Sequence, residues 1–338
     1  MDGIKLAILG ATGAVGGEML KVLAERNFPV SDIKMLADAN DAGKKIIWQG
    51  KEYIVEKTTP DSFEGVELTL VAVDNPISLM FSPEAVRRGS IVIDNSSAYR
   101  LDPEVPLVIA EVNPEDVLWN KGIIANPNCS TIICLVAIKP LYDYSKIKRM
   151  VVSTYQAVSG AGILGIEELK NQAIQYLNNE KIEPKVFAHQ IAYNLIPQID
   201  EFQDNGYTKE ELKLLYESRK ILHDDEILVS CTCVRVPVFR SHSESIMIET
   251  EEKISAAKAK DLLQEAPGVK LVDDPKNKVY PMPLDSSDQD LIFAGRIRED
   301  ISHEKALSLW VCGDQIRKGA ATNAIQIAEL LVKNGLLK

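Results

Sequence analysis

Hydrophobic residues in the first third of the chain form short apolar runs separated by segments of helical period. The runs predict strands at residues 5–10, 33–37, 67–73, 90–96, 107–112 and 122–127. The periodic segments predict helices at residues 14–25 and 82–89. Apolar strands that alternate with helices are typical of a mainly parallel sheet covered on both faces. The pattern therefore predicts an α/β domain.

The pattern changes near Met150, where longer and more polar strands begin. They are predicted at residues 149–158, 225–239, 243–251, 289–300 and 306–314. Their period-two alternation suits a large sheet with one helix-covered face, hence a second, α+β domain. Residues 317–335 form an amphipathic helix that ends in Lys-Asn-Gly, a suitable C-cap. If this helix packs back on the first domain, the domains are 1–128 with 317–338, and 129–316.

Composition narrows the class of protein. The 338 residues are 46% hydrophobic and 26% charged, which is ordinary for a globular protein. A net charge of −11 argues against nucleic-acid or anionic-membrane partners, and no signal segment or long apolar span is evident. Five cysteines at irregular spacings suit neither a disulfide framework nor a zinc site. We expect a cytoplasmic protein without a metal.

A glycine-rich turn follows the first predicted strand and opens the first predicted helix. In "LGATGAVGG", Gly10, Gly13 and Gly16 are spaced three residues apart, with Thr12, Ala14 and Val15 between them. Glycine lets the backbone approach a pyrophosphate closely, and the helix N-terminus presents N–H groups to its charge. This context predicts dinucleotide binding; the alternative is a purely structural turn.

The second predicted strand ends in "MLADANDAGK". Asp38, after Ala37, lies about 25 residues beyond the glycine turn, near the position from which an acidic residue holds the ribose 2′-hydroxyl of NAD. The alternative is a solvated loop of Asp and Asn residues.

Cys129 follows Asn-Pro-Asn at the start of an apolar helical pattern. With a helix beginning at about Ser130, the unpaired N–H groups and the helix dipole favour a thiolate at Cys129. Such a thiolate can attack a carbonyl and form a thiohemiacetal, from which hydride leaves to a nicotinamide. Cys134 is expected in the core, and Cys231, Cys233 and Cys312 are expected to be structural.

A cysteine nucleophile needs a base, and the chain has four histidines. His242 lies between two predicted strands among small polar residues and is the favoured candidate. His189, His223 and His303 lie in ordinary helix or loop contexts and are expected at the surface.

These motifs resemble the aspartate-semialdehyde dehydrogenase family over nearly the whole chain. The similar segments, in the family's order, are "GATGAVG", "NPNCST", "YQAVSGAG", "IAYNLIPQID", "RVPVFRSHSES" and "RKGAATNAIQIAE". The resemblance implies a two-domain fold like that of glyceraldehyde-3-phosphate dehydrogenase, in a homodimer or, alternatively, a homotetramer. It implies reversible conversion of L-aspartate 4-semialdehyde, phosphate and NADP⁺ to L-aspartyl 4-phosphate and NADPH, on the route to lysine, threonine and methionine.

The resemblance also implies roles for particular residues. Cys129 would form the acyl-thioester, His242 would be the acid–base group, and Gln156 would orient the intermediate. Arg235 would hold the substrate's α-carboxylate through its planar guanidinium fork, and Glu217 would meet the amino group.

The remaining implied residues belong to two further sites. A phosphate site would comprise Arg100, Asn128 and Lys220. The nicotinamide end of the cofactor would lie near Ser159, Gly160 and Gln315.

One departure from the family's pattern concerns the cofactor. Many members resemble "ASARSAGK" where this chain has "ADANDAGK", so that Asp38 replaces a serine and Asn40 an arginine, with Asp41 alongside. Acidic groups repel the 2′-phosphate of NADP. The resemblance implies NADP, whereas Asp38 and Asn40 predict use of NAD.

Three rival interpretations are weighed against this one. An N-acetyl-glutamyl-phosphate reductase would have little use for the pair Arg235 and Glu217, which suits a free amino acid. A catalytically silent relative would be expected to lose the thiol or the base, and a Cys–His hydrolase would leave the glycine turn idle.

Overall fold

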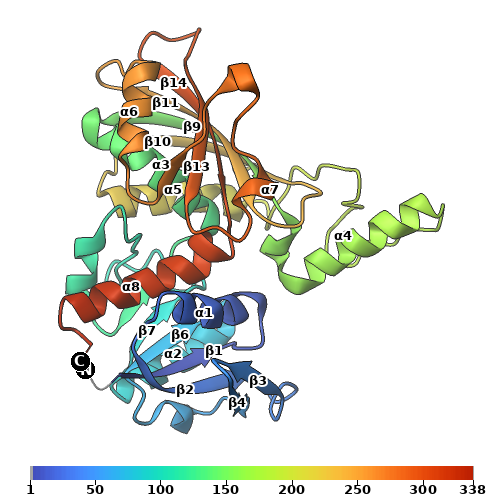
Figure 1. Cartoon of the computed structure of the whole chain (residues 1–338), viewed down its shortest axis with the longest axis vertical. Helices are drawn as coiled ribbons and strands as arrows, with labels where there is room; N and C mark the ends of the chain where they lie inside the picture. Colours follow the sequence, from blue (N-terminus) through green and yellow to red (C-terminus); the bar gives the residue numbers. More distant parts are fainter. Residues whose placement is uncertain (1–2, 338) are drawn as a thin grey trace. The chain divides into compact units, whose positions relative to one another are not determined.

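The computed structural model describes residues 3–337, whose contacts divide into two compact units. One unit comprises the described residues up to Asn128 together with those from Ala320 onward. The other is Cys129–Gly319. Figure 1 shows the elements of each unit along the coloured chain.

The first unit is built on a parallel sheet with strand order β5-β2-β1-β6-β7-β8, beside a separate β3–β4 hairpin. Its strands are β1 (Ile4–Leu9), β2 (Val30–Ala37), β3 (Lys45–Trp48), β4 (Lys51–Ile54), β5 (Glu56–Lys57), β6 (Leu68–Val71), β7 (Ile91–Asp94) and β8 (Ile123–Ala125). Its helices are α1 (Ala14–Glu25), α2 (Asn75–Arg87) and α8 (Thr322–Lys333), with short turns η1 (Pro60–Phe63) and η2 (Pro114–Trp119).

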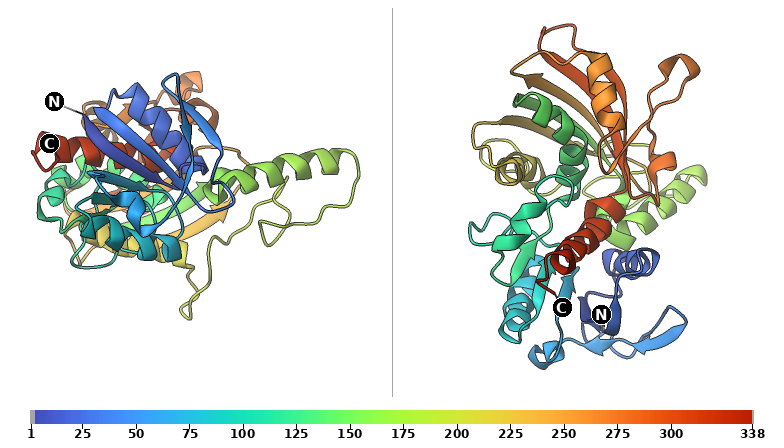
Figure 2. Two further views of the ribbon diagram at one scale, coloured as in Figure 1. Left: turned by 90° about the horizontal axis from the view of Figure 1, so that it is seen from below. Right: turned by 60° about the vertical axis from the view of Figure 1, so that its left-hand side comes forward.

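Alternate side chains of β1 point to two hydrophobic layers. Leu6 and Ile8 belong to a core that includes Met19 of α1 and Ile325 of α8. Ala7 and Leu9 belong to the core on the opposite face, with residues of η1 and α2. The C-terminal helix therefore completes one face of a sheet formed by the N-terminal residues (Figure 2).

The second unit is built on a mixed sheet with strand order β10-β9-β11-β14-β13-β12. Its strands are β9 (Ile147–Gln156), β10 (Leu228–Arg235), β11 (His242–Thr250), β12 (Val269–Leu271), β13 (Ile292–Glu299) and β14 (Ala306–Gly313). Its helical segments are α3 (Cys129–Tyr144), η3 (Val158–Ala161), α4 (Gly162–Leu177), α5 (Lys209–Leu222), α6 (Ala256–Gln264), η4 (Pro275–Asn277), α7 (Pro283–Ser286) and the π-helical turn η5 (Arg317–Ala321), which runs into the first unit.

Helices α3, α5 and α6 contact one face of this mixed sheet. On the opposite face, side chains such as Tyr155 and Trp310 are half-buried, and their tilted rings pack with centroids 5.2 Å apart. Helix α4 extends away from the sheet (Figure 1). No helix among residues 3–337 is long and apolar enough to cross a membrane.

Three predicted elements differ from the structure. The helix predicted at 82–89 begins at Asn75, because Asp74 and Pro76 start it and Pro83 lies inside it. Residues 107–112 form no strand beyond a bridge at Leu107. The terminal α-helix begins at Thr322, because a wider π-helical turn occupies 317–321.

Glu244 is a buried acid at the centre of the mixed sheet. It lies opposite Thr154 of β9 and Val311 of β14, and its side chain is fully buried. Neither carboxyl oxygen has a hydrogen-bond partner among the described residues. Burial, and next the charge of Cys233, raise the pKa of Glu244 well above its ordinary value. The folded protein therefore favours the protonated form of this side chain.

We predict that Glu244→Gln makes folding stability less dependent on pH. Above the ordinary pKa of 4.5, the unfolded chain releases this proton while the folded chain keeps it. The parent therefore loses about 1.4 kcal/mol of unfolding free energy per pH unit, up to the raised folded pKa. Denaturant unfolding at pH 5 and pH 8 should show that the variant gains on the parent as pH rises.

Glu226→Gln is the matched control, because the Glu226 side chain is 88% exposed. It should not change the pH dependence. A constant difference between Glu244→Gln and the parent at both pH values would mean that Glu244 is ionised in the folded protein.

Candidate functional site

The glycine turn between β1 and α1 forms a close-fitting backbone cradle. Gly10 has a φ of +91°, and a Cβ there would lie 2.4 Å from the Ala72 carbonyl oxygen. A Cβ on Gly16 would lie 2.2 Å from the Gly10 carbonyl oxygen. Gly13 is the N-cap of α1, and no side chain caps the helix there. The first-turn N–H groups, which include those of Ala14 and Val15, therefore fit an anion such as a pyrophosphate.

A cavity of about 490 Å³ lies beside this turn in the first unit. Its lining includes Gly10, Thr12, Gly13, Ala37 and Asp38, as well as Asp41. The predicted cofactor residues of this unit therefore lie around one cavity or in the turn beside it.

The acidic loop after β2 is held by its own hydrogen bonds. Asp38 Oδ1 accepts from the backbone N–H of Asn40 at 2.8 Å and of Asp41 at 3.2 Å. Thr12 donates its hydroxyl to Asp41, and Lys44 forms an ion pair with the same carboxylate. These two contacts hold the pKa of Asp41 below its ordinary value. Asp41 therefore joins the loop to the glycine turn.

Arg100 ties together two loops at the carboxyl ends of β7 and β8. Its Nε donates to the Asn126 carbonyl at 2.9 Å, and Nη2 donates to the Asn95 carbonyl at 2.8 Å. The Asn126 amide donates to Asn95 Oδ1 at 2.8 Å and accepts from Asn323 of α8 at 2.6 Å. Asn128, two residues on, is buried. Arg100 and Asn128 thus lie on loops that hydrogen bonds join to each other. Lys220, their predicted partner, is in the other unit.

Three strand ends bring Arg235, Gln156 and His242 together in the second unit. Arg235 ends β10, Gln156 ends β9 and His242 begins β11. Arg235 pairs with Gln156 across the parallel strands, and Gln156 Nε2 lies 3.4 Å from His242 Nε2. All three side chains are buried. Their adjacency follows from the strand register.

His242 is held neutral and in one tautomer. Burial, with the nearby Arg235 charge, lowers its pKa to about 3 against an opposing effect of Glu210. Nδ1 accepts a hydrogen bond from the Ala157 N–H at 3.0 Å. A neutral imidazole has one N–H and one acceptor nitrogen, so Nε2 carries the proton. His242 therefore presents a donor at Nε2.

Arg235 is positioned by the same backbone residue. Its Nη1 donates to the Ala157 carbonyl at 2.8 Å, and its guanidinium lies 5.8 Å from the centre of the Phe187 ring. A cavity of about 220 Å³ opens beside it, lined in part by Phe187, Ile196 and Asp200. An Arg fork at such a cavity suits a carboxylate ligand.

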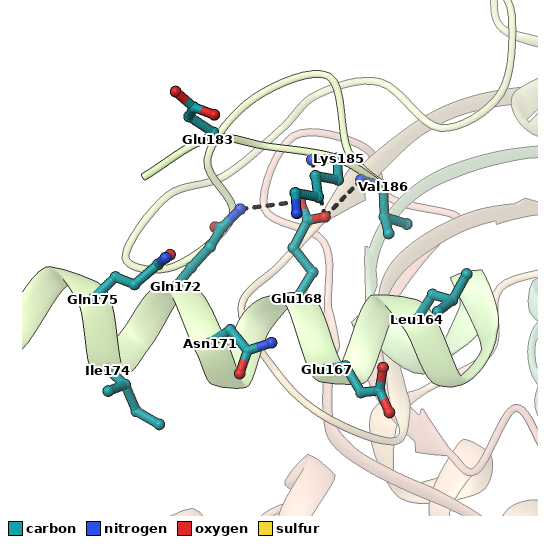
Figure 3. A pocket seen from close by; sticks show the side chains of 10 residues that line it. All are labelled: Leu164, Glu167, Glu168, Asn171, Gln172, Ile174, Gln175, Glu183, Lys185 and Val186. Atoms are coloured by element: carbon teal, nitrogen blue, oxygen red, sulfur yellow. Dashed lines mark hydrogen bonds between the residues drawn. The ribbon is translucent and has the colours of Figure 1, made fainter. Parts of the chain in front are cut away.

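Helix α4 fixes the segment that lines this cavity. Glu168 accepts the backbone N–H groups of Lys185 at 3.0 Å and Val186 at 2.5 Å, and Gln172 accepts that of Ile191 at 2.8 Å. Figure 3 shows Glu168 and Gln172 pointing from α4 toward this segment. The cavity drawn there, of about 540 Å³, is lined by none of the predicted site residues.

Cys129 is the first residue of α3 and is half-buried, whereas the other four thiols are buried. A Cβ on Gly319 would lie 2.9 Å from Cys129 Cβ, so the π-helical turn passes directly beside the thiol. Cys129 and Arg235 interact electrostatically. Burial raises the pKa of Cys134 and raises that of Cys312 to about 12. Cys129 is the thiol suited to reaction.

Gly160, Ser159 and Gln315 also lie in the second unit. A Cβ on Gly160 would lie 2.7 Å from Arg235 Nη1 and 3.3 Å from the His242 ring, so only glycine leaves this space open. Gln315 donates to the Ser159 hydroxyl and accepts the Ser241 N–H at 2.9 Å. These residues border the segment that leads into His242.

The predictions missed Glu210 and Lys213 of α5. Glu210 accepts from Gln156 Nε2 at 3.1 Å and from Lys213 Nζ at 2.9 Å, and Lys213 also pairs with Asp200 at 3.0 Å. Glu210, Lys213, Glu217 and Lys220 follow one another at helical spacing. That spacing places four charged side chains on one face of the helix. The sequence alone could therefore have indicated Glu210 and Lys213.

Comparison with known families defines the class. Residues 5–119 match the semialdehyde dehydrogenase NAD-binding domain, and residues 138–318 match the semialdehyde dehydrogenase dimerisation domain. The structure has a parallel sheet in the residues that match the first of these domains and a mixed sheet in the residues that match the second. The class is therefore that of the semialdehyde dehydrogenases.

Individual relatives narrow the class further. An aspartate-semialdehyde dehydrogenase of Aquifex aeolicus is 55% identical, over 99% of this chain and 100% of that one. The Bacillus subtilis enzyme is 47% identical, over 99% of each chain. The Vibrio cholerae aspartate semialdehyde dehydrogenase II, in a complex with ASA, matches with a TM-score of 0.97 at 46% identity over 99% of each chain. This chain belongs to the aspartate-semialdehyde dehydrogenase family.

Membership confirms several predictions made from the sequence. The chain is an oxidoreductase with the predicted two-part α/β fold, and it binds a nicotinamide dinucleotide. A Candida albicans aspartate semialdehyde dehydrogenase with NADP is 25% identical and matches with a TM-score of 0.76, over 98% of this chain and 99% of that one. The family fold thus accommodates such a cofactor.

Proposed function

We propose that the chain interconverts L-aspartyl 4-phosphate and L-aspartate 4-semialdehyde plus phosphate, a step toward lysine, threonine and methionine. The strongest support is that Arg235, Gln156 and His242 are buried side by side at three strand ends. The same unit has a half-buried thiol, Cys129, at the start of α3. An identity of 55% to a relative of that name adds to it. A nicotinamide dinucleotide, when bound, would supply or accept the hydride.

In the proposed mechanism, the Cys129 thiolate attacks the acyl carbon of aspartyl phosphate. Phosphate leaves, and an acyl-thioester remains on Cys129. Reduction gives a thiohemiacetal, which releases the aldehyde and returns the thiolate. The positive end of α3 favours the thiolate before the attack and again when the aldehyde leaves.

The geometry favours His242 as a hydrogen-bond donor in the resting protein. Because Nδ1 accepts from Ala157, Nε2 carries the N–H, which in the proposed mechanism stabilises a thiolate or a developing oxyanion. Receiving the thiol proton at Nε2 would first require the resident proton to leave. The side-chain amide of Gln156 offers a second N–H, and its Nε2 lies 3.4 Å from His242 Nε2.

The substrate's polar groups are assigned to the residues that the family resemblance implies. Arg235 holds the α-carboxylate beside the 220 Å³ cavity, and Glu217 meets the amino group. Arg100, Asn128 and Lys220 form the phosphate site. The pair of Arg235 and Glu217 favours a free amino acid over an N-acetylated one.

We also propose boundaries and a setting for the protein. The cofactor domain comprises residues 1–128 with the C-terminal helix, and the catalytic and dimerisation domain follows Asn128. All five cysteines are thiols, which supports a reducing cytoplasm.

We predict that Cys129→Ser reduces turnover by several orders of magnitude without unfolding the protein. A serine hydroxyl is barely ionised at neutral pH and cannot form the thioester. The measurement is formation of reduced dinucleotide from L-aspartate 4-semialdehyde and phosphate.

Cys134→Ala is the matched control, because it removes a buried thiol from the same helix. It should keep turnover within about twofold, since a thiol with a raised pKa is not the nucleophile. Wild-type protein without activity would instead point to a silent relative or another substrate.

A second prediction concerns the 2′-position of the cofactor. Asp38 and Asp41 border the 490 Å³ cavity beside the glycine turn, which Lys57 also lines. Lys44 pairs with Asp41, and Lys45 pairs with Glu52 at 2.9 Å. We therefore propose that NAD is used at least as well as NADP. Asp38→Ser with Asn40→Arg should shift the ratio of kcat/KM toward NADP by about tenfold or more.

Asp32→Ser is the control for this pair, because Asp32 is an exposed acid toward the opposite end of β2. It should leave the ratio unchanged. A hundredfold preference of the parent for NADP would refute the proposal.

A third prediction concerns assembly. The half-buried outer face of the mixed sheet and the exposed apolar residues of α4, such as Leu164 and Leu177, belong to the region that matches the dimerisation domain. We propose a homodimer that covers them. Light scattering should give about twice the 37.4 kDa of one chain. A mass of four chains would indicate the tetramer, and a mass of one chain would contradict the proposal.

A further inference from the structure

Asp314 directly follows β14, and its side chain is fully buried. It has no part in the proposed chemistry, yet each of its carboxylate oxygens accepts two hydrogen bonds. Oδ1 accepts the backbone N–H groups of Ile316 at 2.9 Å and Arg317 at 3.1 Å. Oδ2 accepts Arg240 Nε at 2.5 Å and the backbone N–H of Asp288 at 2.7 Å. A buried carboxylate with four directed donors is held in one position.

The Oδ2 side of Asp314 holds the turn that leads into His242. Arg240 and Ser241 immediately precede His242, the first residue of β11. Ser241 is buried and has a φ of +75°, in the left-handed region that favours glycine. A strained backbone of this kind persists only where its surroundings fix it. The Ser241 N–H donates to Gln315 Oε1 at 2.9 Å, and the bond from Arg240 to Asp314 fixes the residue before it.

The Oδ1 side of Asp314 holds the turn that passes beside Cys129. The N–H group of Arg317 begins η5, and further along this turn the Gly319 N–H donates to the Asp314 carbonyl at 3.0 Å. A Cβ on Gly319 would lie 2.9 Å from Cys129 Cβ. The position of this backbone against the thiol-bearing residue therefore depends on Asp314.

The strand register explains why a side chain joins the two turns. His242 pairs with Gly313 at the end of the antiparallel ladder between β11 and β14. The ladder ends at this pair, and Asp314 lies directly beyond it. A carboxylate accepts hydrogen bonds at both oxygens, whereas an amide would turn a donor toward one of the two turns. The charge also suits Arg240, whose Nη1 pairs with Asp288 at 2.7 Å.

We propose that Asp314 is a positioning residue that joins the turn before His242 to the turn beside Cys129 and so holds the acid–base group and the nucleophile in one arrangement. This inference rests on the proposed function. It predicts that turnover and thiol reactivity change while affinity for the substrate is kept, a combination that a loss of stability alone would not produce.

Asp314→Ala tests the proposal, because it removes all four side-chain bonds. We expect kcat to fall about tenfold or more, since the reacting groups are no longer held in one geometry. The KM for L-aspartate 4-semialdehyde should stay within about twofold, because Arg235 keeps its bond to Ala157. Alkylation of Cys129 by iodoacetamide should become about threefold faster or more, since η5 loses bonds that hold it. Mass spectrometry should show the four buried thiols still unlabelled.

Arg240→Gln separates the two sides of the carboxylate. It removes the charged bond to the turn before His242 and keeps the bonds from Asp314 to η5. We expect a loss of kcat with alkylation of Cys129 within about twofold of the parent. This variant also decides the matter if Asp314→Ala does not fold, because a kcat of Arg240→Gln within twofold of the parent would overturn the proposal.

Asp273→Ala is the matched control. The Asp273 side chain is 1% exposed and pairs with Lys260 at 2.9 Å. It also accepts the backbone N–H groups of Arg296 at 2.8 Å and Ile297 at 3.2 Å. It is thus a buried acid of the same unit with the same kinds of partner, but those partners belong to α6 and β13. The variant should lower the melting temperature and leave kcat and Cys129 alkylation within about twofold of the parent.

The outcomes decide the matter in both directions. A kcat of Asp314→Ala within twofold of the parent overturns the proposal, and so does an equal loss of kcat in Asp273→Ala. A lower melting temperature of Asp314→Ala with unchanged alkylation of Cys129 also overturns it. Alkylation needs no substrate, so an inactive parent would refute the proposed function while the comparison of Asp314→Ala with Asp273→Ala still tests the contact beside Cys129.

Discussion

One backbone residue, Ala157, holds two side chains of the candidate site, His242 and Arg235. Its N–H donates to Nδ1 of His242 at 3.0 Å, and its carbonyl accepts from Nη1 of Arg235 at 2.8 Å. It directly follows β9, whose register with β10 and β11 places these two strand ends beside it. The N–H and the carbonyl of Ala157 belong to two peptide units joined at its Cα, so the spacing of imidazole and guanidinium follows from the backbone at the end of β9 rather than from flexible side chains.

Much of the fold was predictable because local pattern and tertiary structure agree. Helix α1 has the predicted bounds Ala14–Glu25, since a strand, a glycine turn and an apolar period all indicate the same start. Residues 107–112 were wrongly predicted as a strand. Their apolar residues are buried, but the Asn113 side chain bonds to the Ile109 N–H and the Leu107 carbonyl in place of a neighbouring strand. The amino-acid composition of the segment does not show that a side chain, rather than a neighbouring strand, bonds to its backbone.

The candidate site was predictable by residue type and family motif but not by hydrogen bonding. Cys129 and His242 are distinctive residues in unusual contexts. Ala157 and Gly319 are not, because their contributions are a peptide group and an absent side chain. Glu210 was not predicted because an acidic residue in the first turn of a helix is commonly explained by its favourable interaction with the helix dipole. Only its distances to Gln156 and Lys213 distinguish it.

In the second unit, strand β11 of the mixed sheet buries two ionisable side chains at a cost in folding stability. His242 is neutral because burial and Arg235 oppose its charge, and Glu244, two residues further along β11, is neutral because burial opposes its charge. An apolar residue at either position would fold more readily. At His242 the loss of folding stability is explained by the proposed chemistry, which needs an N–H held in one direction within a buried site. The same strand therefore combines sheet-forming Ile246 and Ile248 with polar groups whose burial lowers stability, which is the arrangement expected where a sheet must also position a reaction.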